Sequence, residues 1–387
     1  MSDDSPLAAP LVRWQRTHGR HDLPWQTGRT PYRVWVSEIM LQQTQVTTVI
    51  GYYQRFMQRF PDVHALAAAP LDEVLHLWAG LGYYSRARNL HRAAQRVVRD
   101  FGGVFPDDIE GLAGLPGIGR STAGAILALG SGLRAPILDG NVRRVLARYF
   151  AVRGDPVSSP VTRELWTLAE RCTPSRDVDV YTQAIMDLGA TVCTRHAPRC
   201  GDCPLHEGCE ALRRDLVAEL PERRVRAGRP TRRVAMLLLV NADGQVLLQR
   251  RAPQGVWAGL WAPPQFDSVE AARAWGAQWQ SRDAAVSEQV LPLLRHAFTH
   301  FELEITPLLW RAARWHAGIV GASASASASA VADSADYLWY DPSAPARVGL
   351  PAPVTALVKL AVPGEFRLEG AAASKARPKG RRAARGG

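Results

Sequence analysis

Two acidic residues lie in contexts that could support acid–base chemistry. Glu38 stands in Trp35-Val-Ser-Glu-Ile-Met-Leu, where apolar neighbours should surround its carboxyl group. Burial disfavours the charged form of a carboxyl, so the pKa of Glu38 should rise and the group should hold a proton near neutral pH. The pattern supports a catalytic role and an ordinary structural role equally at this position.

Asp139 stands in Ile137-Leu-Asp-Gly-Asn-Val-Arg, where Gly140 permits a sharp turn at the start of a helix. An aspartate in this place is more often a helix N-cap than a catalyst, and the pattern favours the cap. Cleavage of a glycosidic bond needs a proton for the leaving group and stabilisation of positive charge on the sugar. A pair of carboxyl groups can divide that work.

Four of the 5 cysteines crowd into one short segment, with the spacing Cys193-x6-Cys200-x2-Cys203-x5-Cys209. An odd count with one tight cluster favours a metal site in a reducing compartment over a disulfide framework. Thiolate ligands select zinc or an iron–sulfur cluster, and the single CxxC pair weakens the zinc interpretation. The remaining Cys172 is predicted to be a buried core residue.

A glycine-containing turn, Leu115-Pro-Gly-Ile-Gly-Arg-Ser-Thr, separates two helical patterns within residues 107–130. Gly117 and Gly119 should allow a tight turn and a close approach of the backbone to a ligand. The amides at the start of the following helix would then point at an anion. The pattern predicts a helix-hairpin-helix that holds the DNA backbone without reading its sequence.

The elements that must position these residues form two parts with different predicted secondary structure. Residues 8–210 are predicted to be helical, 211–232 to be an arginine-rich linker, 233–362 to be a mixed α+β domain, and 363–387 to be a disordered basic tail. The helical periods include Tyr32–Phe60, Leu71–Trp78, Ala87–Asp100 and Thr162–Arg171, and the strand candidates are Ala235–Val240, Gln245–Gln249, Leu303–Trp310 and Tyr337–Tyr340. Gly321–Ala330 is a Ser-Ala repeat that is predicted to be a flexible insertion.

The overall charge indicates the kind of partner. The formal net charge is +11, which favours a polyanion, and nucleic acid is the commonest one. No apolar run is long enough to span a bilayer, and the N-terminus has no signal-peptide core. A cytoplasmic protein without a membrane partner is expected.

Several strings together resemble a known family. SEIMLQQTQV, GLGYYSRARNL, LPGIGRSTAGAI, LDGNVRRVL and the cysteine spacing are similar to adenine DNA glycosylases of the MutY type, in the endonuclease III superfamily of helix-hairpin-helix glycosylases. The resemblance implies an all-α glycosylase domain with a [4Fe–4S] loop held by the four clustered cysteines, followed by an α+β Nudix-like domain. It also implies a monomer, associated with the nucleoid, that acts on duplex DNA with A:8-oxoguanine or A:G mispairs.

The same resemblance implies catalytic roles. Glu38 would protonate the adenine at N7 and later activate water, and Asp139 would stabilise the oxocarbenium-like sugar. Asn141 would hydrogen-bond near the reacting nucleotide, and Ser121 would line the site. Lyase-competent relatives carry a lysine at the position of Ser121, and a hydroxyl cannot form an imine, so a monofunctional enzyme is expected. Arg143 stands where some relatives have a lysine that traps DNA, so trapping should be absent.

DNA contacts are implied in both parts of the chain. Gln42 and Tyr83 match positions that insert into the duplex when the target base is flipped out. Residues around the extruded adenine would be Trp25, Leu41 and Gln183. In the second domain, Arg295-His-Ala-Phe-Thr-His-Phe resembles the loop that recognises oxidised guanine, with Phe298 as a wedge and Thr299 and His300 as hydrogen-bonding residues.

Three alternatives remain open from the residues alone. An endonuclease III-like glycosylase/lyase for oxidised pyrimidines is disfavoured by Ser121 and by the second domain. A nucleotide pyrophosphohydrolase is disfavoured because Glu270 is not part of an RExxEE-like carboxylate set that could hold magnesium. A non-catalytic DNA-binding module is disfavoured by the presence of both Glu38 and Asp139.

Overall fold

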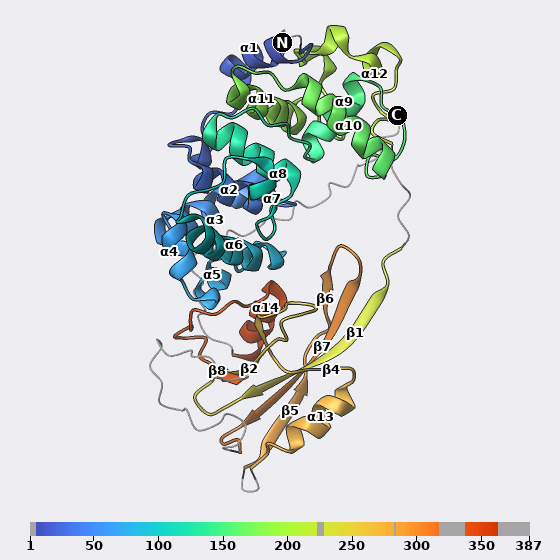
Figure 1. Ribbon diagram of the computed structural model, residues 1–387. Helices are drawn as coiled ribbons and strands as arrows, with labels where there is room; N and C mark the ends of the chain where they lie inside the picture. The colour runs from blue at the N-terminus through green and yellow to red at the C-terminus, as the bar shows by residue number, and fades with distance from the viewer. Residues whose placement is uncertain (1–4, 223–227, 282–283, 317–336, 363–387) are drawn as a thin grey trace, which may run out of the picture.

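The computed structural model describes residues 5–222, 228–281, 284–316 and 337–362. Within these ranges, a helical N-terminal part is followed by a mixed sheet with helices (Figure 1). The Ser-Ala repeat, the basic tail and residues 223–227 of the predicted linker lie outside the described residues. None of the described helices combines the length and the apolar character that crossing a bilayer requires.

The helical part contains α1 (Ala8–His18), η1 (Pro24–Gln26), α2 (Pro31–Leu41), α3 (Val46–Arg59), α4 (Val63–Ala68), α5 (Leu71–Leu77), α6 (Ser85–Phe101), α7 (Ile109–Ala113), α8 (Arg120–Ala125), η2 (Ile126–Ser131), α9 (Gly140–Tyr149), α10 (Ser159–Cys172), α11 (Val178–Thr191), η3 (Cys200–Asp202), η4 (His206–Gly208) and α12 (Glu210–Arg213). The sheet part contains β1 (Thr231–Val240), β2 (Val246–Arg250), β3 (Trp261–Ala262), β4 (Gln265–Phe266), α13 (Val269–Ala277), β5 (Val286–Val290), β6 (Leu294–Ala297), β7 (Glu302–Ala312), β8 (Tyr337–Tyr340) and α14 (Ala352–Ala361). The predicted all-α and α+β classes are confirmed.

The apolar period over 32–60 is divided between α2 and α3. Gln42 leaves the helical conformation with φ −57° and ψ 112°, and Gln43 is left-handed with φ 58°. The apolar repeat continues across this break because both helices turn their apolar faces to one core. The repeat therefore gives no sign of the change in backbone conformation at Gln42 and Gln43. A second departure lies after α8, where η2 continues the helix with π geometry.

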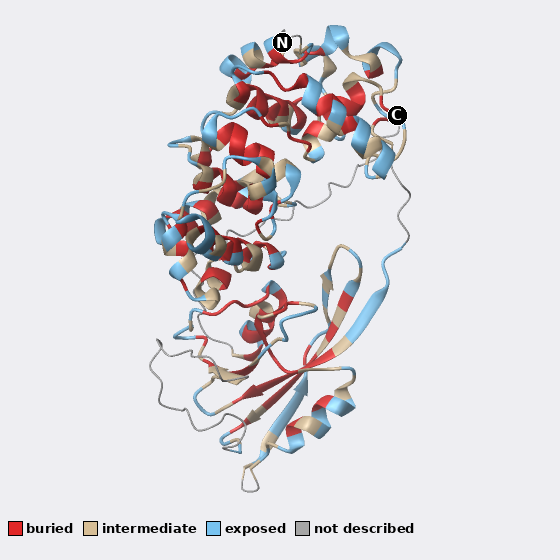
Figure 2. Ribbon diagram, viewed as in Figure 1, coloured by how far each residue is buried: buried red, intermediate tan, exposed pale blue. Residues whose placement is uncertain are grey.

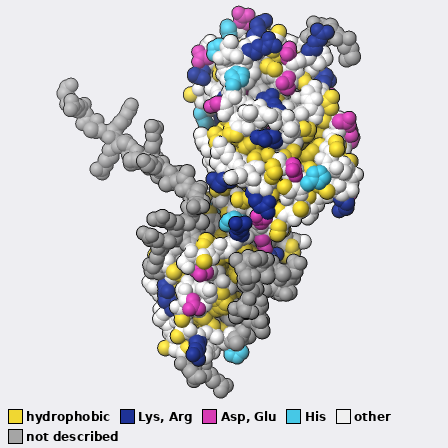
Figure 3. All heavy atoms as spheres, turned by 90° about the vertical axis from the view of Figure 1, so that its left-hand side faces the viewer, with side chains coloured by type: hydrophobic (Ala, Val, Ile, Leu, Met, Phe, Trp, Pro, Cys, Tyr) yellow, Lys and Arg dark blue, Asp and Glu magenta, His cyan; other side chains and the backbone are white. Residues whose placement is uncertain are grey.

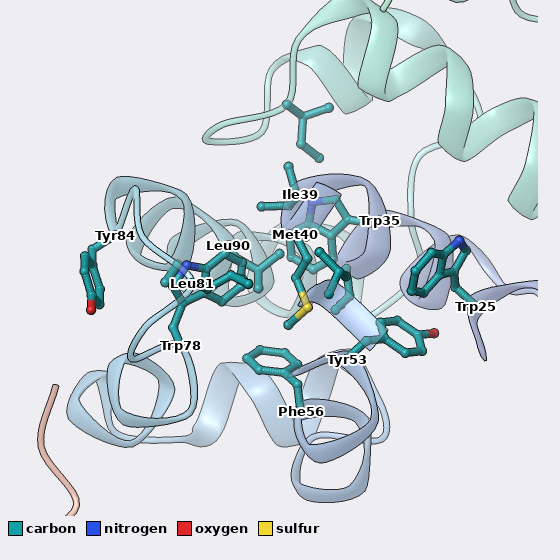
Figure 4. Close-up of a cluster of buried hydrophobic side chains, with 14 of the residues drawn as sticks. Trp25, Trp35, Ile39, Met40, Tyr53, Phe56, Trp78, Leu81, Tyr84 and Leu90 are labelled. Atoms are coloured by element: carbon teal, nitrogen blue, oxygen red, sulfur yellow. The ribbon is translucent and has the colours of Figure 1, made fainter. Parts of the chain in front are cut away.

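Aromatic side chains fill the core of the helical part (Figure 4), and Figure 2 shows the buried stretches of its helices in red. The rings of Phe56 and Trp78 are fully buried and meet edge to face, with centroids 6.1 Å apart. Trp25 packs in the same manner on Tyr53, with ring centroids 5.5 Å apart, so its ring belongs to the core of the helical part. Such pairs add about 0.5–1.5 kcal/mol each beyond their burial. Cys172 is completely buried, as predicted.

Strand β1 is the centre of the sheet. It pairs in parallel with β7 and antiparallel with β2 and β4, and Val240 opposite Val246 closes the predicted hairpin. Alternate residues of β1 enter different clusters: Met236 and Leu238 face the α14 side, and Leu237 and Leu239 face the α13 side. A strand covered on both faces reads as a continuous apolar run, as this one does.

The two parts of the chain meet through α5 and α6. The hydroxyl of Tyr84 donates to the carbonyl of Leu350 at 3.1 Å, and Nη1 of Arg88 donates to the carbonyl of Ala258 at 2.6 Å. Arg250 also forms an ion pair with Asp72. These contacts fix which loops of the sheet part face the helical part.

Gly124 in α8 provides a stability prediction. A Cβ atom there would overlap the carbonyl oxygen of Pro136, in the segment that leads to Asp139, whereas a Cβ at Gly119 meets open space. We expect Gly124→Ala to lower the free energy of unfolding by about 1–3 kcal/mol, because overpacking forces the backbone apart. Urea unfolding followed by circular dichroism measures the loss. Gly119→Ala, at the N-cap of the same helix, is the matched control, and equal stability of the two variants would contradict the packing.

Candidate active site

A cavity of about 440 Å³ opens in the helical part among α2, α8, α9 and α11. Its wall includes every residue that the sequence predicts for catalysis or for the adenine pocket, together with one predicted duplex-inserting residue. They are Glu38, Ser121, Asp139, Asn141, Trp25, Leu41, Gln183 and Gln42. Segments far apart in the sequence therefore supply one concave site, which is the usual form of a small-molecule or nucleobase pocket.

Glu38 lies near the C-terminal end of α2 and faces this cavity. Burial, and to a lesser extent the nearby negative charge of Asp139, raises the pKa of its carboxyl group to about 8. At neutral pH the group is therefore mostly protonated and can act as an acid.

Asp139 caps α9, as its pattern favours. Its Oδ1 accepts a hydrogen bond from the backbone N–H of Val142 at 2.7 Å. Burial raises the pKa of Asp139, while hydrogen bonds from the amides of Val142 and Asn141 oppose that rise. The cap fixes the side chain in the cavity wall beside Glu38, so capping and participation in chemistry are compatible.

Two neighbours hold the Asp139 turn in place. The hydroxyl of Ser121 accepts from the backbone N–H of Leu138 at 3.0 Å, which ties α8 to the residue before Asp139. Oδ1 of Asn141 accepts from Nη2 of Arg144 at 2.7 Å, and Nε of Arg144 donates to the carbonyl of Cys193 at 2.7 Å. One arginine therefore fastens the cysteine segment to the start of α9.

Three residues that hold the cavity wall were missed by sequence reasoning: Arg20 and Arg29 line the cavity, and Asp187 contacts its wall residue Gln183. Asp187 is completely buried and accepts from Nε of Arg20 at 2.9 Å and from Nε2 of Gln183 at 2.9 Å. Nη2 of Arg29 donates to Oε1 of Gln183 at 3.2 Å, so both ends of that amide are held. The acidic residue among the mostly apolar buried positions of α11 was the available signal, because a buried carboxylate requires partners.

The four clustered cysteines line a second, small cavity of about 30 Å³ whose other walls include Leu188, Val192 and Leu205. Nη1 of Arg148 donates to Sγ of Cys193 at 3.3 Å. Across the described residues, no three His, Cys, Asp or Glu side chains form a site for a single metal ion. Convergence of four soft donors on one apolar cavity suits an iron–sulfur cluster better than an ion with oxygen ligands.

The predicted hairpin lies between α7 and α8. Gly117 is left-handed with φ 78°, and a Cβ there would press on Asn89, so glycine is required. Gly119 has φ −93°, which any residue adopts, so the expectation of unusual backbone freedom is wrong at this position. Open space around Gly119 still allows close approach from solvent.

Residues predicted to meet the duplex come together from both parts of the chain. The hydroxyls of Tyr83 and Thr299, 216 residues apart, lie 3.1 Å from each other. Phe298, Thr299 and His300 occupy the turn between β6 and β7, where the N–H of Phe298 donates to the carbonyl of Phe301 at 2.8 Å. The ring of Phe298 stacks on that of Phe301 at 4.6 Å.

Comparisons with known proteins agree with this architecture. The sequence model for HhH-GPD superfamily base excision DNA repair proteins matches residues 36–171, and that for the NUDIX domain matches 235–360. The chain is 34% identical over 349 residues to the adenine DNA glycosylase of Buchnera aphidicola subsp. Acyrthosiphon pisum, covering 90% of this chain and 95% of that protein. It is 48% identical over 214 residues to the adenine DNA glycosylase of Homo sapiens, covering 53% of this chain and 39% of that protein.

A solved structure described as a thermostable thymine-DNA glycosylase is similar over 54% of this chain and 95% of its own, with 28% identity and a TM-score of 0.49. The family assignment depends on the sequence relatives, because the first of them is matched over nearly its whole length. The chain belongs to the adenine DNA glycosylase family.

Proposed function

We propose that this protein hydrolyses the N-glycosidic bond of adenine mispaired with 8-oxoguanine, and less efficiently with guanine, in duplex DNA. The observation that carries the proposal is the cavity in which Glu38, with a pKa near 8, lies beside Asp139. The protein would act as a monomeric base excision repair enzyme on cytoplasmic, nucleoid DNA. The proposed glycosylase and lesion-recognition domains are residues 8–210 and 233–362, joined by 211–232.

The proposed reaction begins with an extruded adenine in the cavity. Protonated Glu38 donates its proton to N7, which weakens the bond between C1′ and N9. The bond electrons leave with the base, and the ionised carboxylate of Asp139 stabilises the positive charge that develops on the sugar. Glu38, now ionised, accepts a proton from the water that attacks C1′, which restores its starting state.

Recognition of the opposite base is assigned to the junction of the two parts. Gln42 and Tyr83 would fill the space left by the adenine, and Phe298, Thr299 and His300 would contact the oxidised guanine. The hydrogen bond between Tyr83 and Thr299 supports a shared contact surface. Extrusion removes the base from the stack, so the vacated space must be filled by side chains.

Cys193, Cys200, Cys203 and Cys209 would hold one [4Fe–4S] cluster, which would supply covalent cross-linking of this segment rather than bond cleavage. The walls of their cavity and the hydrogen bond from Arg148 to Cys193 support the assignment. The exposed side chain of Arg195, between the first two cysteines, would face phosphate.

A single-turnover assay tests the activity. Duplexes with A opposite 8-oxoguanine, A opposite T, and thymine glycol opposite A are treated with alkali as a separate step. We expect breakage only of the first, and only after alkali. Glu38→Gln should lower the single-turnover rate constant for the A:8-oxoguanine duplex by about 10²–10⁴-fold, because the amide cannot donate the proton. Exposed Glu170→Gln is the control. Cleavage of thymine glycol without alkali would instead favour the endonuclease III-like alternative.

The pKa of Glu38 predicts the pH dependence. The proton that it donates is present below about pH 8 and is lost as the pH rises through that value. The single-turnover rate constant should therefore fall about tenfold for each pH unit above 8. On the acid side, the rate should fall as Asp139 becomes protonated. Circular dichroism at each pH monitors folding, and a rate that stays constant from pH 7 to 9.5 would refute the role of Glu38.

The cluster assignment is tested by composition. The purified protein should contain iron and acid-labile sulfide in equal amounts and absorb visible light. Cys203→Ser should lose iron and stability, because oxygen replaces a soft ligand. Cys172→Ala, which changes the one cysteine outside the cluster segment, should keep the iron content. Zinc in place of iron and sulfide would show that the assignment is wrong.

A further inference from the structure

Arg86, in the first turn of α6, is buried although it carries a positive charge. Its two terminal nitrogens form six hydrogen bonds, and five of the acceptors are backbone carbonyls. Within the described ranges it forms no ion pair with a carboxylate. Burial of a guanidinium is costly, so the backbone carbonyls that compensate for it mark a place where geometry is tightly held.

One set of acceptors lies at the end of α2. Nη1 donates to the carbonyls of Ile39 at 2.8 Å, Met40 at 2.8 Å and Gln42 at 2.6 Å. The carbonyls of Ile39 and Met40 are among the last four of the helix and lack partners within it. Ile39 follows Glu38 directly, and Gln42 is the first residue beyond the helix. Arg86 therefore fixes the point where the catalytic helix becomes the duplex-facing segment.

The other set lies in the turn that carries Tyr83. Nη2 donates to the carbonyls of Leu81 at 3.3 Å and Gly82 at 3.1 Å. The guanidinium also lies 5.5 Å from the centroid of the Tyr83 ring, within cation–π range. Figure 4 shows Leu81 and Trp78 of this turn beside Met40 of α2 in one cluster.

Both segments contain a strained residue. Gln43 has φ 58° and Tyr83 has φ 49°, values that side-chain-bearing residues seldom adopt. Such conformations persist only where the surroundings enforce them, and they gather at functional sites. Among the residues that the structure describes, Arg86 is the one side chain that hydrogen-bonds to the carbonyls next to both, those of Gln42 and Gly82.

We propose that Arg86 is a positioning residue for base extrusion, whose guanidinium fixes Gln42 and Tyr83 relative to each other and to the helix that carries Glu38. The inference depends on the proposed function, in which Gln42 and Tyr83 fill the space left by the adenine. It adds that one side chain, Arg86, holds both of them in place. On the face shown in Figure 3, the basic side chains of the described residues are dispersed among apolar ones.

The planar guanidinium is required because it reaches both segments at once. A lysine has one nitrogen with three donors and cannot span the two sets of carbonyls. Arg86→Lys should therefore retain part of the function, and Arg86→Met should retain less. Val97→Ala, a buried change on the same helix and remote from both segments, is the control for general destabilisation.

The experiment uses the full-length protein with its cluster, at a temperature where thermal melts show that every variant is folded. Single-turnover excision is measured on the A:8-oxoguanine duplex, with active enzyme counted from the burst. Extrusion is measured separately by the fluorescence of 2-aminopurine in place of the adenine. Affinity is measured for a duplex with a tetrahydrofuran abasic analogue opposite 8-oxoguanine, which has no base to extrude.

For Arg86→Met we expect the excision rate constant to fall about 100-fold, because a small displacement of positioned groups has an effect of that size. The 2-aminopurine fluorescence signal should fall to a matching extent. Affinity for the abasic duplex should change much less, and Val97→Ala should leave all three values near those of the parent. A folded Arg86→Met with parental excision and fluorescence would overturn the inference, as would equal losses in all three measurements. If the parent removes no adenine, the proposed function fails, which is a separate result.

Discussion

The desolvation of one carboxyl group is the constraint on which the rest of the site depends. Glu38 is placed at the end of an apolar helix and faces a cavity, so ionisation is unfavourable and its pKa lies near 8. The second carboxyl group in the same wall, that of Asp139, is also buried, and burial raises its pKa, but backbone amides at the start of α9 donate to it and oppose that rise. Two similar side chains therefore meet different surroundings in one wall.

Packing keeps these two environments apart. Close contact of Gly124 with Pro136 and the hydrogen bond from Leu138 to Ser121 bring α8 against the segment before Asp139. Gly189 in α11 packs on Asn141, where a Cβ would lie 2.6 Å from the Cβ of the asparagine. Interiors are dense, so a change of one methyl group in either place would move the cap and its carboxylate.

The sheet part contributes surface rather than reacting groups to the proposed chemistry. It is docked on α6 through Leu350 and Ala258 and on α5 through the ion pair of Arg250 with Asp72, and its β6–β7 turn meets Tyr83. Helix α6 thus touches both the sheet part and, through Arg86, the end of the helix that carries Glu38. This one helix therefore connects the part of the protein proposed to recognise the opposite base with the part proposed to remove adenine.

The sequence by itself determined the two fold classes, the main helices and strands, the cysteine cluster and eight residues of the cavity wall. It could do so because periodicity, turn residues and spacing are local signals, and because the motifs match a family as sets. Tertiary structure decided the rest. The break at Gln43, the hydrogen bonds of Arg86, the network around Asp187 and the meeting of Tyr83 with Thr299 all depend on segments distant in sequence. Such contacts result from packing between elements, and no local pattern records them.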